Sequence, residues 1–101
     1  RLAEHRGRAA HALRRAGVLA EAGFEIEAGA SLREAVSHLG RALAVARRMD
    51  PPDDEGRWTQ SPWDTLWGGE RAAVQGLLAN PADDWRAGRQ ALESLLRSLP
   101  E

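Results

Sequence analysis

The chain has 101 residues, a formal net charge of −1 and no cysteine. This length supports one domain, 1–101, and the lack of cysteine excludes disulfides and thiolate metal sites. Alanine (19) and leucine (13) dominate, whereas there are one isoleucine, four valines and no tyrosine, so the composition favours helices over strands. No apolar run approaches the ~20 residues that a membrane-spanning helix needs. We therefore expect no membrane association and a cytoplasmic location.

Two helices are predicted in the first half of the chain. The first covers residues 2–22 and ends at Gly23. The second begins near Glu25 and stops before Asp50, although Ser31 is an alternative N-cap because it forms a capping-box pattern with Glu34. Arg47 and Arg48 are expected in its last turn, where cations suit the helix dipole. Its predicted core face comprises Phe24, Ala28, Leu32, Ala35, Val36, Leu39, Ala42, Leu43 and Ala46.

Residues 50–61 are predicted to form a loop between two helical hairpins. The third helix begins at Ser61-Pro62, which match the N-cap and first-position preferences, and Gly68-Gly69 are expected to split it. The fourth helix runs from Pro81 to about Leu99. Because only Asn80 separates these two helices, we expect an antiparallel hairpin. The predicted fold class is an all-α, four-helix, up-and-down antiparallel bundle.

Charge is distributed unevenly along the chain. Residues 1–49 carry nine Arg and five acidic residues, whereas residues 50–101 carry five Arg and ten acidic residues. Arg1, His5, Arg8 and Arg15 lie on one side of the first predicted helix and are candidate binding residues. A basic stripe of this kind can contact a phosphate backbone. Since no aromatic residue is interleaved with it, we favour a partner-facing surface over nucleic-acid binding.

The tryptophans divide into two groups. Trp63, Trp67 and Trp85 lie at core positions of the third and fourth predicted helices. Trp58 lies in the polar loop, where no helix face accounts for it, and exposed tryptophans often anchor interfaces. Trp58 is therefore a further candidate binding residue.

Catalytic and metal-binding motifs are absent from the sequence. There is no Gly-x-Ser-x-Gly motif and no phosphate-binding loop. His5 and His11 are six residues apart, about 240° around a helix, and so cannot grip one metal ion. We expect no metal and no cofactor, and a chain that is not an enzyme.

The stretch from Leu13 to Val45, LRRAGVLAEAGFEIEAGASLREAVSHLGRALAV, resembles the front half of HEPN-type helical domains. It is also similar to helical segments at the C-terminal ends of some bacterial Swi/Snf-type helicases. The resemblance implies a four-helix bundle that often dimerises beside a nucleotide-handling partner. Some members are metal-independent ribonucleases with an Arg-x4–6-His string, which here matches Arg33 and His38. A five-residue spacing places those two side chains ~140° apart on a helix.

Residues 34–51 also resemble the second helix of a tetratricopeptide repeat. One copy does not build a peptide-binding solenoid, which needs about three. Because the chain begins with Arg1 and its predicted core is rich in alanine, we expect a domain of a larger bacterial protein, stabilised by a neighbouring domain or by homodimerisation. The favoured function is a non-catalytic interaction or accessory module. The HEPN-type ribonuclease and the repeat fragment are the alternatives.

Overall fold

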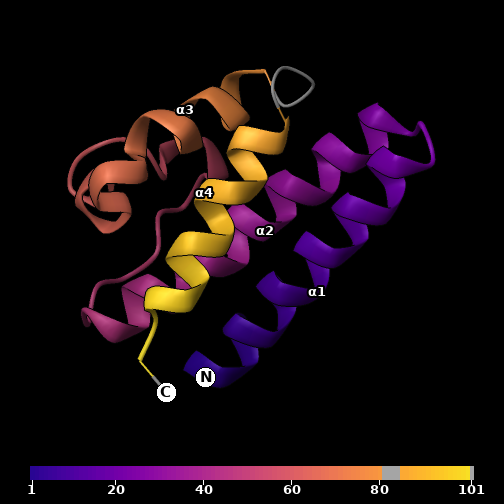
Figure 1. Ribbon diagram of the computed structural model, residues 1–101. Coiled ribbons are helices and arrows are strands. Elements are labelled where there is room, and N and C mark those ends of the chain that lie inside the picture. The colour runs from indigo at the N-terminus through magenta and orange to yellow at the C-terminus, as the bar shows by residue number, and fades with distance from the viewer. Residues whose placement is uncertain (81–84, 101) are drawn as a thin grey trace.

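A computed structural model describes residues 1–80 and 85–100, which form helices and no strands. The elements are α1 (Leu2–Glu21), α2 (Glu25–Ala46), the 3-10 helices η1 (Glu55–Arg57) and η2 (Trp63–Glu70), α3 (Arg71–Ala79) and α4 (Trp85–Ser98). The all-α prediction is confirmed. Helices α1 and α2 form a long hairpin, and α4 packs against α1, α2 and α3 (Figure 1). Within these ranges, no helix has both the length and the apolar character needed to cross a membrane.

The α1–α2 hairpin turns sharply at Gly23, whose positive φ of 90° favours glycine. The Phe24 amide donates to the Leu19 carbonyl at 2.8 Å, which closes the turn. Helix α2 begins at Glu25 as predicted, and the alternative start at Ser31 is wrong. Ser31 is buried inside the helix, where its hydroxyl accepts a hydrogen bond from Arg15 Nε at 3.0 Å.

Helix α2 ends at Ala46, one residue before the two arginines that were predicted to occupy its last turn. Arg48 has a positive φ of 56°, and the Met49 amide donates to the Ala44 carbonyl at 2.8 Å. This is the pattern of a helix end closed by a left-handed residue, a position that usually holds glycine. The Met49 side chain then packs against the core.

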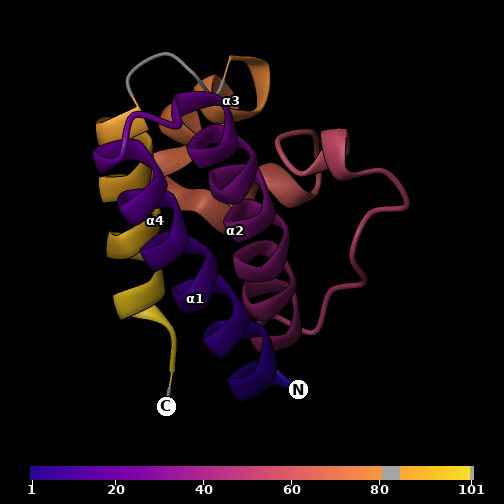
Figure 2. The ribbon, with the colours of Figure 1, turned by 90° about the vertical axis from the view of Figure 1, so that its right-hand side faces the viewer.

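Two indole N–H groups help to hold the segment between α2 and α3, which passes along one side of α2 in Figure 2. Trp63 donates to the Asp50 carbonyl at 2.7 Å, and Trp67 donates to the Trp58 carbonyl at 2.8 Å. The Trp58 and Trp67 rings pack edge to face, with centroids 6.1 Å apart. Trp58 also packs against Gly40 of α2. Residues 50–61, predicted as a loop, thus contain no α-helix; most of them are exposed, and Pro52 and Trp58 are the two that are buried.

The predicted third helix is divided at Gly68, as expected, because that residue has a positive φ of 53°. Gly68 lies inside the 3-10 element η2, and the α-helix proper begins only at Arg71. The predicted start of the fourth helix at Pro81 lies outside the described residues. Gly88 of α4 faces Leu77 of α3 so closely that an added Cβ would lie 2.5 Å from a Leu77 methyl group.

The core lies between α1, α2, α3 and α4, and it also receives side chains from the segment that joins α2 to α3. Its largest fully buried side chains are Trp58, Trp67, Leu32, Leu39, Leu66, Leu92, Val36 and Val74. Trp63 and Trp85 pack against this core but are only partly buried. Phe24 was predicted on the core face of α2 and is instead 53% exposed, because burial along α2 begins only at Ala28.

Candidate functional site

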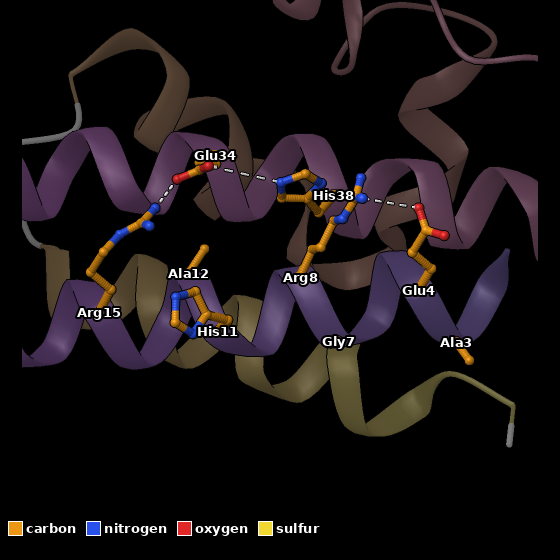
Figure 3. Close-up of a pocket in the computed structure, with 9 residues that line it drawn as sticks. All are labelled: Ala3, Glu4, Gly7, Arg8, His11, Ala12, Arg15, Glu34 and His38. Atoms are coloured by element: carbon orange, nitrogen blue, oxygen red, sulfur yellow. Dashed lines mark hydrogen bonds and ion pairs between the residues drawn. The ribbon is translucent and has the colours of Figure 1, made fainter.

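An open groove of about 580 Å³ runs between α1 and α2. Figure 3 shows its side chains, which come mostly from α1 and face two residues of α2. The lining residues are Ala3, Glu4, Gly7, Arg8, His11, Ala12 and Arg15 from α1, with Glu34 and His38 from α2.

The α1 residues of the groove recur every three or four positions, so they form one stripe along the helix. Small residues keep the middle of this stripe open, since a Cβ added at Gly7 would meet no atom of the described residues within 4 Å. Arg8 and Arg15 are separated by seven residues, about 10 Å along the helix axis. The stripe therefore places one guanidinium on either side of His11.

Carboxylates hold both arginines in the structure. Arg8 Nη2 lies 3.2 Å from Glu4 Oε1, and both side chains are more than half exposed. Arg15 pairs with Glu34 across the two helices. The other oxygen of Glu34 lies 4.0 Å from His38 Nε2. Because exposed ion pairs are screened by water and salt, they contribute little to stability.

His38 lies in a positive environment. Its side chain is 21% exposed, and its Nδ1 atom is buried with no hydrogen-bond partner among the described residues. Burial lowers the pKa of His38, and the positive charges of Arg8, Arg41 and Arg15 lower it further, against a smaller opposing effect of Glu55. The environment of His38 therefore disfavours its protonated form.

The predicted basic stripe is only partly assembled in this groove. Arg8 and Arg15 line it, whereas Arg1 is exposed at the start of α1 and His5 is half-buried beside the groove. Burial lowers the pKa of His5, with Glu4 opposing and Arg41 adding to the effect. Among described residues, the His5 Nδ1 atom also has no hydrogen-bond partner.

Arg33 and His38 do not meet at one site. Arg33 Nη2 donates to the Leu78 carbonyl at 3.1 Å, in the last turn of α3, where helix carbonyls lack partners within the helix. It lines a separate cleft of about 510 Å³ between α2, η1 and the end of α3. This divergence agrees with the five-residue spacing of the two side chains along one helix.

Trp58 is a core residue, and its expected role as an exposed interface anchor is wrong. The side chain is 0% exposed, and its Nε1 atom donates to Glu55 Oε2 at 2.7 Å. Arg41 holds the other Glu55 oxygen at 2.8 Å. Burial alone would raise the pKa of Glu55, but hydrogen bonds from Arg41, Trp58 and Ser37 together lower it. In the sequence, the feature that could have indicated burial of Trp58 was Gly40, because a glycine inside a helix leaves room for an aromatic ring.

The hairpin tip, residues 18–27, carries the exposed large apolar side chains found within the described ranges. Val18 is 67% exposed, Phe24 53% and Ile26 81%. Three exposed carboxylates, Glu21, Glu25 and Glu27, lie among them in sequence.

The sequence analysis did not identify three polar groove residues, Glu4, His11 and Glu34. Each lies four residues from another groove residue on its own helix, namely Arg8, Arg15 and His38, and this spacing places each pair on one helix face. In the part of the chain that the structure describes, no three His, Asp or Glu side chains are arranged to hold a metal ion. Comparison with known proteins finds no matching family model, curated protein or solved structure.

Proposed function

We propose that this chain is a non-catalytic interaction or accessory module that docks a protein partner or a second copy of itself through the α1–α2 hairpin. The proposal includes an up-and-down antiparallel order of the four helices. Two features support that order: the tight turn at Gly23 and the packing of α4 against both arms of the hairpin.

The observation that carries the proposal is the concentration of exposed apolar side chains at the hairpin tip. Single exposed apolar residues are common on protein surfaces, but clusters mark interaction sites. Here three large ones fall within nine residues, at one end of the hairpin (Figure 1). Covering them with a partner would remove apolar surface from water, which is the main driving force for association.

The ribonuclease alternative is less well supported by the geometry. It needs Arg33 and His38 at one site, whereas Arg33 is directed toward α3 and His38 toward α1. A catalytic pair has to reach the same substrate atoms.

Site-specific photo-crosslinking tests the proposal. A photoreactive apolar residue at Ile26, introduced into the protein in its native cells, should give a discrete crosslinked product. The same residue at Ala46, exposed at the other end of α2, is the matched control and should give none. Light scattering over a concentration series then shows whether the product corresponds to a dimer of this chain.

A second variant tests the energetic contribution of the tip. Burying an isoleucine side chain contributes about 1.5–3 kcal/mol, so Ile26→Ser should weaken the captured complex about 10- to 150-fold. Docking through the tip would be ruled out if position 46 crosslinked as strongly as position 26. It would also be ruled out if Ile26→Ser left the complex unaffected.

A further inference from the structure

We propose that the groove between α1 and α2 binds a dianionic phosphate group, either free phosphate or the terminal phosphate of a small molecule, between Arg8 and Arg15. This goes beyond the proposed docking function, which uses the hairpin tip, and involves a separate set of residues. The groove is open and about 580 Å³ in volume, which is ample for such a group.

The groove provides donors of the kind that phosphate requires. Arginine presents several N–H groups in a planar fork that matches the oxygens of a phosphate. Arg8 and Arg15 line the groove together with Gly7 and Ala12, and His11 lies between the two arginines on the same stripe. His38 faces this stripe from α2 (Figure 3). The donors thus come from both walls of the groove.

The local field also favours an anion. The same arginines that disfavour a proton on His38, namely Arg8, Arg15 and Arg41, would attract a negative charge placed beside it. Arg41 belongs to α2 and the other two to α1, so the positive field is produced by both helices. Two carboxylates oppose this field near His38: Arg41 already binds Glu55, and Arg15 pairs with Glu34, whose other oxygen lies 4.0 Å from His38 Nε2.

The two carboxylates in the groove set the selectivity. Glu4 and Glu34 occupy Arg8 and Arg15 in the structure. Because these pairs are exposed and therefore weak, a ligand that carries two charges on adjacent oxygens can displace them, whereas a singly charged phosphodiester competes less well. We therefore assign the site to a dianion rather than to a nucleic-acid backbone.

NMR titration of the histidine ring protons with sodium phosphate at pH 7.5, against sodium chloride of matched ionic strength, tests the assignment. Phosphate should shift the His11 and His38 signals saturably and raise the apparent pKa of His38. Arg8→Gln should weaken binding at least tenfold, and folding should be preserved because the ion pair that it breaks, with Glu4, is exposed. Arg14→Gln, an exposed arginine next to Arg15 but outside the groove, is the matched control.

Glu4→Gln separates a binding role from a structural one. Removing the competing carboxylate should strengthen phosphate binding about threefold to tenfold, an effect that a purely structural role of Arg8 does not produce. A nucleoside 5′-monophosphate serves as a second probe. Tighter binding of the monophosphate than of inorganic phosphate would identify a small-molecule phosphate as the ligand, and equal binding would identify phosphate alone.

Three results would overturn the assignment. The first is the absence of histidine shifts beyond those in chloride. The second is a phosphate response that Arg8→Gln and Arg14→Gln change equally. The third is that a uridine decamer without terminal phosphates binds more tightly than inorganic phosphate and that this binding depends on Arg8. That result would make the groove a site for a nucleic-acid backbone.

Discussion

Replacing Gly40 by alanine tests whether the packing of Trp58 against α2 decides the fold. An alanine Cβ at position 40 would lie 2.8 Å from two Trp58 ring atoms, whereas ordinary contacts are about 3.5–4.0 Å. The ring cannot move away easily, because it is fully buried, donates to Glu55 and packs against Trp67. Overpacking of this kind costs about 1–3 kcal/mol, and the better helix propensity of alanine returns about 0.5–1 kcal/mol. The difference between these ranges is a net loss of about 0–2.5 kcal/mol, centred near 1 kcal/mol.

Urea unfolding followed by circular dichroism measures this loss, with Gly7→Ala as the matched control. Gly7 lies inside α1, and an alanine Cβ there would have no atom of the described residues within 4 Å, so the same exchange should stabilise the protein by about 0.5–1 kcal/mol. In thermal unfolding, each kcal/mol corresponds to about 4–8 °C in Tm for a domain of this size. If Gly40→Ala proves as stable as Gly7→Ala, the close packing of Trp58 on α2 is refuted.

Four further predictions concern a helix end, the core and two ionisable side chains. Arg48→Gly should raise the free energy of unfolding by about 0.5–1 kcal/mol, measured by urea unfolding, because glycine adopts the positive φ of 56° without steric strain; a loss of stability would contradict this. Leu92→Ala should cost about 2–5 kcal/mol in the same assay, since Leu92 is completely buried, and a loss below 1 kcal/mol would contradict its core position. Stability should fall as the pH drops below about 6.5, because the lowered pKa of His38 lets the unfolded chain take up a proton that the folded chain resists. His38→Gln should reduce this fall, and an unchanged pH profile would refute the effect. A second fall in stability is expected below about pH 4.5, where the lowered pKa of Glu55 lets the unfolded chain take up a proton before the folded chain does, and Glu55→Gln should reduce it.

Local sequence determined the helices of this protein. Alanine and leucine at helical spacing predicted α1 and α2 with errors of a few residues at most, and Gly23 and Gly68 marked the turn and the kink where the structure has them. These features are set by interactions within a few residues, namely backbone hydrogen bonds, side-chain periodicity and the freedom of glycine at positive φ. The divergence of Arg33 and His38 is likewise local, because a five-residue spacing on one helix directs the two side chains to different faces.

Only the tertiary structure decided which aromatic side chains are buried. Periodicity placed Phe24 in the core and left Trp58 outside it, and both assignments were wrong. Phe24 lies on the correct side of α2 for burial but precedes the first buried turn, whereas the chain beyond α2 folds back and places Trp58 over Gly40. The groove between α1 and α2 could not be predicted from periodicity for the same reason. Arg15 and Glu34 are 19 residues apart in the sequence and meet only when the hairpin closes. Periodicity describes one helix at a time, but burial and site assembly depend on which other segments cover each face.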